Sequence, residues 1–91
     1  MNWNIEWMSH FFSYEGVALL QENPDCGLSD IPALCTLIGQ AIMELNPDLL
    51  AIEEGPAHIE QMQLFVSRFL QDRYTCITYV LYSQILFYSL F

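Results

Sequence analysis

The stretch that decides the fold class is residues 46–56, which read Asn46-Pro47-Asp48-Leu49-Leu50-Ala51-Ile52-Glu53-Glu54-Gly55-Pro56. A helix is predicted to end at Leu45, because proline cannot continue a helix and disfavours helical backbone at the residue before it. Residues 49–52 then form an apolar run of strand length that ends at two adjacent carboxylates. Strand neighbours point to opposite faces, so Glu53 and Glu54 are expected to serve different purposes. One carboxylate at the carboxyl end of a buried strand is a candidate metal ligand, because open α/β sheets bind ligands at that end.

Two amphipathic helices flank this stretch. The first is expected to be capped by Ser29 or Asp30, with Pro32 in its first turn. Its apolar stripe has spacings of three and four: Ile31, Leu34, Ile38, Ile42 and Leu45. The second is expected to begin at Pro56 and to end at residues 72–73. Its stripe is Ile59, Met62, Phe65, Val66, Phe69 and Leu70.

Two further segments have the pattern of strands. Residues 1–8 alternate between apolar and polar side chains, and residues 74–82 are aromatic and β-branched. Residues 9–28 contain several chain breakers and are expected to be irregular, with a helical turn at 17–21. The resulting order of strand, loop, helix, strand, helix, strand predicts an α/β fold of parallel strands joined by right-handed helical crossovers.

Composition limits the class of protein. The chain has 91 residues, which allows one small domain or a piece of a larger one. It is 54% hydrophobic, above the roughly 45–50% of ordinary globular domains. We therefore expect surfaces that further chain, a partner or a membrane covers. An odd number of cysteines without a C-x-x-C pattern predicts reduced, structural thiols. The amino terminus lacks a signal peptide's pattern, so a cytoplasmic location is expected.

The charge balance argues against nucleic acid as a direct partner of this chain. The formal net charge is −9, and Arg68 and Arg73 are its two cations. Binding to a phosphate backbone normally requires a basic patch. No cation is interleaved with the early aromatic residues, so these are expected to belong to the core rather than to a base-stacking platform. They are Trp3, Trp7, Phe11 and Phe12.

Residues 76–91 contain no charge, no glycine and no proline. The segment is slightly short for a membrane helix, which needs about 20 residues. Three interpretations compete: a buried strand, a strand end that a partner covers, and a tail inserted in a membrane. The buried strand is favoured, and a membrane contact is not expected.

Asn4 and Glu54 are the leading candidate pair for chemistry. Both fall on predicted strands, and the 50 residues between them hold one crossover connection, so adjacent parallel strands would bring them together. One amide and one carboxylate suit Mg²⁺, which takes one or two protein oxygens and keeps several waters. The sequence pattern by itself is also compatible with a purely structural interpretation, and it favours that interpretation. Asn4 would then lie in a turn, and Glu54 would be a solvated carboxylate.

Two motifs resemble those of the endonuclease/exonuclease/phosphatase superfamily. Residues 2–8, Asn-Trp-Asn-Ile-Glu-Trp-Met, resemble its opening strand, which has an aromatic or small residue, then Asn, then an aliphatic residue. Residues 38–54 resemble its second motif, in which a helix is followed by a Pro-Asp turn, an apolar strand and a terminal Glu. The resemblance extends over residues 1–73.

The resemblance implies a metal-dependent hydrolase of phosphoester bonds, such as a nuclease or a phosphatase. Asn4 and Glu54 would bind one or two Mg²⁺ or Mn²⁺ ions, and the metal would polarise a phosphoryl oxygen while water attacks. Glu53 would lie outside the metal ligands, and Glu6 is a weaker candidate for a residue that supports them. The family fold is a four-layer α/β sandwich of two sheets flanked by helices.

The chain also departs from the family pattern, because the central Asp-x-Asn and the late catalytic His are missing. His10 and His58 do not match those motifs: His10 is expected in a loop and His58 on a solvated helix face. No catalytic residue is therefore assigned. Residues 1–75 are expected to be the N-terminal part of the domain without its second sheet. Residues 76–91 are expected to be an apolar tail, which is either a natural strand or a truncated or out-of-frame end.

The chain is predicted to be the N-terminal fragment of a Mg²⁺-dependent phosphoester hydrolase. It would be inactive alone, and the phosphoester would be the substrate of the intact parent. The first alternative is a short protein that oligomerises through an uncovered apolar face. The second alternative is a small protein tethered to a membrane through residues 76–91.

Overall fold

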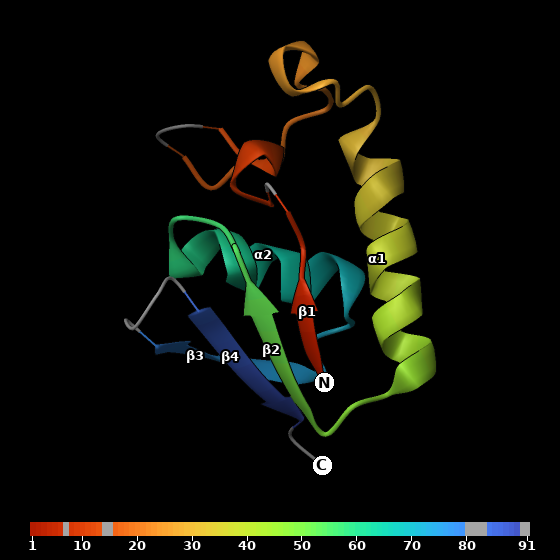
Figure 1. Cartoon of the computed structure of the whole chain (residues 1–91), viewed down its shortest axis with the longest axis vertical. Helices are drawn as coiled ribbons and strands as arrows, with labels where there is room; N and C mark the ends of the chain where they lie inside the picture. The colour runs from red at the N-terminus through yellow and green to blue at the C-terminus, as the bar shows by residue number, and fades with distance from the viewer. Residues whose placement is uncertain (7, 14–15, 80–83, 90–91) are drawn as a thin grey trace.

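A computed structural model describes residues 1–6, 8–13, 16–79 and 84–89 of the chain. These residues form a four-stranded sheet with two α-helices packed on one face (Figure 1). The elements in chain order are β1 (Asn2–Asn4), the 3-10 helices η1 (Met8–Phe11) and η2 (Pro24–Cys26), α1 (Ile31–Leu45), β2 (Leu49–Glu53), α2 (Ile59–Phe69), β3 (Tyr74–Tyr79) and β4 (Gln84–Ser89). The predicted α/β class is confirmed.

The strand order in the sheet is β1-β2-β4-β3. β1 and β2 are parallel, whereas β4 is antiparallel to both of its neighbours, β2 and β3. β3 therefore runs in the same direction as β1 and β2, as the alternating pattern predicts, but it is not adjacent to β2.

The strand predicted over residues 74–82 is observed only as far as Tyr79, and residues 80–83 lie outside the described residues. Residues 84–89 form a further strand, β4, that the sequence did not predict. The reason is physical: residues 76–91 contain no glycine, proline or charge to mark a turn within the apolar run. The described residues of this segment are strand residues, which agrees with the strand interpretations.

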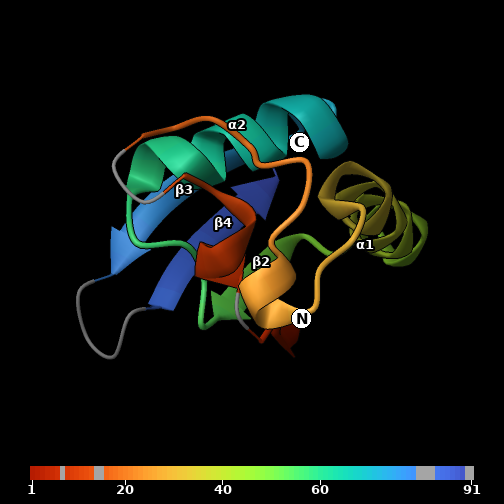
Figure 2. The ribbon, with the colours of Figure 1, turned by 90° about the horizontal axis from the view of Figure 1, so that it is seen from above.

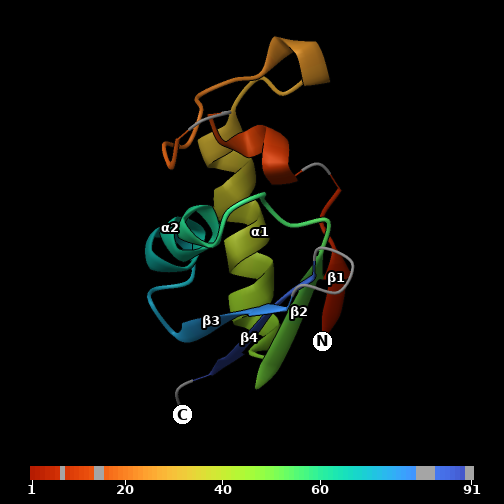
Figure 3. The same cartoon turned by 90° about the vertical axis from the view of Figure 1, so that its left-hand side faces the viewer.

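Both helices lie on the same side of the sheet (Figures 2 and 3). The topology explains this arrangement. The β1-to-β2 and β2-to-β3 connections move across the sheet in the same direction, and right-handed crossovers in one direction place their helices on one face. In Figure 2, α1 lies over the β1 end of the sheet and α2 on the side of β3 and β4. No described helix covers the opposite face.

The hydrophobic core fills the space between the helices and the sheet. On β2 the burial alternates: Leu50 and Ile52 are fully buried, whereas Leu49 is 53% exposed. The strand that the sequence predicts at 49–53 is thus present, but it is buried on one face only. The helices and the early loops supply most of the remaining core: Ile5, Met8, Phe11, Phe12, Ile31, Cys35, Ile38, Ile42, Met62, Phe65, Val66, Leu70 and Tyr74.

The α1 helix has the predicted limits but a different inward face. The Asp30 carboxylate accepts a hydrogen bond from the Ala33 N–H at 3.2 Å, which confirms the predicted cap. Leu45, expected in the buried stripe, is 67% exposed, so that assignment is wrong. Cys35 and Gly39 face inward instead. Small residues here allow close contact with α2, which a pattern of large apolar residues does not reveal.

The α2 helix begins at Ile59 rather than at Pro56. His58 is extended and precedes the first turn, and the Gln61 side chain accepts a hydrogen bond from the His58 N–H at 3.2 Å. This is one half of a capping box, and it places the helix start three residues later than proline alone suggests.

The first strand is shorter than the predicted span of 1–8. β1 ends at Asn4, although the Ile5 N–H still donates to the Glu53 carbonyl at 3.2 Å. Glu6 lies in a turn, and Trp7 is outside the described residues. The helical turn predicted at 17–21 is wrong, because Leu19 forms an antiparallel bridge with Phe12.

Gly39 is the point at which α1 and α2 approach most tightly. A Cβ atom at this position would lie 2.5 Å from the Phe69 carbonyl oxygen. We expect Gly39→Ala to lower the free energy of unfolding by about 1–3 kcal/mol, because backbone atoms must shift to admit the methyl group. At an unconstrained helix position the same change would stabilise by about 0.5–1 kcal/mol. Chemical denaturation measures the difference, with the exposed Gln40→Ala as the control. Unchanged or higher stability of Gly39→Ala would contradict the tight crossing.

Two thiols, the buried Cys35 and the half-buried Cys76, should make the protein sensitive to alkali. Burial raises the pKa of Cys35 from 9.0 to about 11, although Arg68 lowers it, and burial raises the pKa of Cys76 to about 11. Because the folded state favours the neutral thiols, this stabilisation is complete below pH 9 and is lost as the pH rises towards 11. Denaturation at pH 8, 9, 10 and 11 should show a falling free energy of unfolding. The fall should be smaller in Cys35→Ala, and an equal fall would contradict this account.

Candidate metal site

The parallel pairing of β1 and β2 brings Asn4 and Glu54 to the same edge of the sheet. Asn4 lies opposite Glu53 in the register, and Glu54 is the next residue along the chain. Both strands end at this edge, as the arrowheads in Figure 1 show. The Asn4 and Glu54 side chains are exposed. The structure therefore places the two predicted ligands close together in the fold, at the carboxyl end of parallel strands.

Glu54 has an unusual backbone conformation. Its φ is 55°, in the left-handed region that side chains other than glycine rarely adopt. This conformation ends β2 and starts the turn through Gly55 towards α2. Glu54 consequently leaves the alternation of the strand, and the turn sets its direction.

Glu53 differs from Glu54 in its surroundings. It is half-buried on β2, and its Oε1 atom accepts a hydrogen bond from the Asn2 side-chain amide at 3.3 Å. The carboxylate thus joins β1 to β2. This position agrees with the expectation that the two glutamates have different roles.

The remaining polar candidates are near Asn4 or Glu54 in the sequence, but the structure does not gather them into one cluster. Glu6 is exposed in the turn after β1, and its supporting role stays a prediction. His10 is exposed in η1, and its carbonyl accepts a hydrogen bond from the Asn23 side-chain amide at 3.1 Å. His58 is exposed at the start of α2.

The donor set suits a hard divalent cation only in part. Among the described residues, no group of three or more His, Cys, Asp or Glu side chains is placed to hold a metal ion. One amide oxygen from Asn4 and one carboxylate from Glu54 remain. Mg²⁺ is commonly held by one or two carboxylates together with waters and substrate phosphates, so this pair fits half of such a site.

Gln61 connects α2 to the loop that follows η1, and the sequence analysis did not single it out. Its side chain is 2% exposed, and its Nε2 atom donates to the Gly16 carbonyl at 2.9 Å and to the Ser13 carbonyl at 3.5 Å. With its contact to the His58 N–H, this amide ties the first turn of α2 to the loop that follows η1. A polar residue within a helix ordinarily faces solvent, and the only sequence signal was its place three residues after a helix start.

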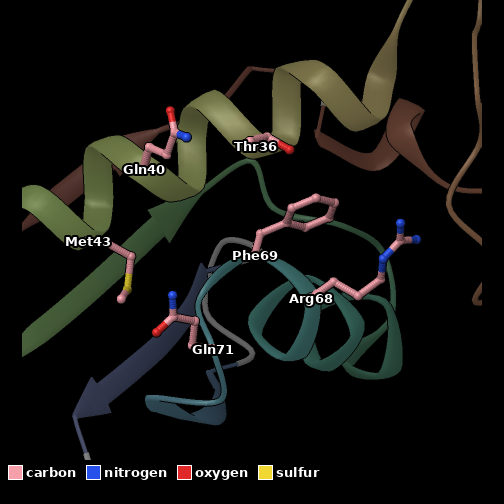
Figure 4. Close-up of a pocket in the computed structure, with 6 residues that line it drawn as sticks. All are labelled: Thr36, Gln40, Met43, Arg68, Phe69 and Gln71. Atoms are coloured by element: carbon pink, nitrogen blue, oxygen red, sulfur yellow. The ribbon is translucent and has the colours of Figure 1, made fainter.

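A separate groove lies between the two helices, with a volume of about 340 Å³ (Figure 4). The residues that line it are Thr36, Gln40, Met43, Arg68, Phe69 and Gln71. The Arg68 guanidinium carbon lies 5.2 Å from the centre of the Phe69 ring. Arg68 is in the last turn of α2, where a cation offsets the negative end of the helix dipole. The groove adjoins the C-terminal end of α2, whereas Glu54 precedes its N-terminal end.

Within the described ranges, no helix combines the length and the apolar character needed to cross a bilayer.

Replacing the buried amide of Gln61 should test its role as an anchor. We expect Gln61→Met to lower the free energy of unfolding by about 1–3 kcal/mol, because buried carbonyls lose their hydrogen-bond donor. Gln63→Met, at an exposed position of the same helix, should change it by less than about 0.5 kcal/mol. Thermal or urea denaturation compares the two. Equal effects would show that the Gln61 contacts do not stabilise the fold.

Comparison of the chain with models of protein families, with curated proteins and with solved structures gave no significant match.

Proposed function

We propose that this chain contributes the metal-binding half of a Mg²⁺-dependent phosphoester hydrolase, with Asn4 and Glu54 as the protein ligands. The observation that carries the proposal is the register of β1 and β2. It places Asn4 opposite Glu53, one residue from Glu54, at the carboxyl end of the only parallel pair among the described strands.

The chemistry of the two side chains supports this assignment. The Asn4 amide oxygen and the Glu54 carboxylate would hold the ion, and waters or substrate phosphate oxygens would complete its coordination. A bound Mg²⁺ supplies a Lewis acid that polarises a phosphoryl oxygen. The cation would also offset, at this edge, the repulsion between a phosphate and a chain of net charge −9.

We infer that the chain does not hydrolyse phosphoesters by itself. The motifs that would supply a general base and position the nucleophile are missing from the sequence. The sheet also has a face that no described helix covers, and Leu49 and Ile77 on β2 and β3 are 53% and 41% exposed. In a two-sheet sandwich the second sheet would pack against this face and bring the remaining catalytic groups.

Metal binding by the isolated chain tests the site directly. Addition of small amounts of Mn²⁺ should broaden the amide NMR signals of residues near Asn4 and Glu54 before those of other acidic residues. Glu54→Gln should weaken this binding by about tenfold or more, because the pair loses its carboxylate. Glu60→Gln removes an equal charge from an exposed position of α2 and serves as the control. Broadening of all acidic segments at similar Mn²⁺ concentrations would refute the site.

An activity measurement tests the second part of the proposal separately. With bis(p-nitrophenyl) phosphate and Mg²⁺, the purified chain should show no turnover above background. Turnover that disappears in Glu54→Ala would confirm the metal site but contradict the inferred inactivity.

A second candidate function is an interaction module that pairs through the uncovered sheet face. The exposure of Leu49 and Ile77 on the sheet favours it, because large apolar side chains left in solvent can serve as contact points for a partner. This candidate predicts that Ile77→Lys abolishes the association while leaving Mn²⁺ binding unchanged.

A further inference from the structure

The groove between α1 and α2 has walls whose charge differs from that of the whole chain. Its lining residues come from α1, from the last turn of α2 and from the loop that follows α2 (Figure 4). None of the six is acidic, although the chain has 11 Asp and Glu residues, and Arg68 is one of its two cations. The volume of about 340 Å³ lies in the lower part of the roughly 300–1,000 Å³ range of small-molecule sites. The groove therefore suits a small organic ligand that carries an anionic group.

The Arg68 guanidinium is placed so that its N–H groups stay available to a ligand. Within the described part of the chain it contacts an aromatic ring rather than a carboxylate, because its central carbon lies 5.2 Å from the centre of the Phe69 ring. Figure 4 shows this ring extending from α2 towards α1, with the guanidinium beside it. A guanidinium that lies over a ring uses its flat face, and its donors point outward in its plane.

The charge of Arg68 also acts on α1, across the groove. Burial raises the pKa of the Cys35 thiol to about 11, and the positive charge of Arg68 opposes this rise. Cys35 belongs to the buried side of α1. The electrostatic influence of the guanidinium therefore reaches the opposite wall as well as the solvent.

Gln71 supplies a second donor, on the loop that follows α2. The Arg73 Nη2 atom donates to the Gln71 Oε1 atom at 3.4 Å, which leaves the Gln71 Nε2 group to donate elsewhere. The φ of Gln71 is 54°, in the left-handed region that residues with side chains rarely adopt. The same contact brings the second cation of the chain next to a residue that lines the groove.

The carbonyl groups at the end of α2 do not cancel this donor character. Such groups carry partial negative charge when they lack a partner. The Val66 carbonyl accepts hydrogen bonds from the Leu70 and Asp72 N–H groups at 3.0 and 3.2 Å. The Leu70 carbonyl accepts one from the Arg73 N–H at 3.1 Å. Because the turn satisfies these carbonyls, the donors of Arg68 and Gln71 remain for a ligand.

We propose that the groove binds a small organic monocarboxylate with a flat apolar body. The Arg68 guanidinium and the Gln71 amide hold the carboxylate, because N–H donors match its two oxygens. The apolar body lies against Met43 and Phe69, the two apolar residues of the lining. A single charge on the ligand limits its repulsion from a chain of net charge −9, and salt screens that repulsion beyond about 8 Å. The proposal does not depend on the metal site, because Glu54 lies at the other end of α2.

An NMR titration of the isotope-labelled chain with 1-naphthoate, at constant ionic strength, tests this site. The amide signals of residues 36–43 and 68–71 should shift first, with saturation in the millimolar range. Arg68→Gln should weaken binding at least about tenfold, because the carboxylate loses its charged partner. Gln63→Glu changes the net charge by the same amount at an exposed position of α2 outside the groove lining, and it should change the Kd less than about twofold. No shifts at these residues, or equal weakening by both variants, would overturn the proposal.

A neutral ligand and two further variants test whether the groove selects the carboxylate. The amide 1-naphthamide has the same ring system without the charge and should bind at least about fivefold more weakly. Gln40→Glu adds a carboxylate to the lining and should weaken binding of naphthoate but not of naphthamide. Arg68→Lys keeps the charge without the planar donors and should weaken naphthoate less than Arg68→Gln does. Circular dichroism should confirm that every variant keeps its helix content. Equal affinity of the unmodified chain for the two ligands would overturn the proposal.

Discussion

The parallel hydrogen bonding between β1 and β2 is the constraint on which the rest of the structure depends. The Ala51 N–H donates to the Met1 carbonyl at 2.9 Å, and the Ile5 N–H donates to the Glu53 carbonyl at 3.2 Å, at the two ends of the pair. Parallel neighbours need a crossover connection, so this pairing requires α1 to cross one face of the sheet. It also makes both strands end at the same edge. The helical layer and the candidate metal site are thus two consequences of one set of backbone contacts.

Local chemical signals explain which parts of the fold could be predicted. The cap at Asp30 and the Asn46-Pro47 turn gave the limits of α1, and the glutamates after Ile52 gave the end of β2. The inward face of α1 could not be predicted in the same way, because Gly39 contacts Phe69, which is distant in the sequence. β4 was missed for another reason: its boundaries depend on pairing with β2 and β3 and not on any turn residue in the apolar run.

The candidate site likewise has parts that could be predicted from the sequence and parts that could not. The order of the strands was enough to predict that Asn4 and Glu54 meet at one edge. The role of Gln61 could not be predicted, because its hydrogen-bond partners in the loop after η1 lie 45 and 48 residues away in the sequence. A buried amide with distant carbonyl partners has the same local pattern as a solvated one. Leu45 of α1 was likewise assigned to the core, since helical spacing alone does not say which apolar residues of a helix stay exposed.

The left-handed backbone at position 54 favours glycine, whereas the proposed metal site requires the carboxylate of Glu54. The conformation costs a residue with a side chain of order 1 kcal/mol or more, and glycine adopts it without strain. A change to glycine would therefore relax the turn after β2 and at the same time remove the carboxylate. Selection for stability alone would favour glycine at this position, whereas a need for the carboxylate would favour glutamate. Among natural variants of this chain, the residue at position 54 should therefore distinguish sequences that keep the site from sequences that retain only the fold.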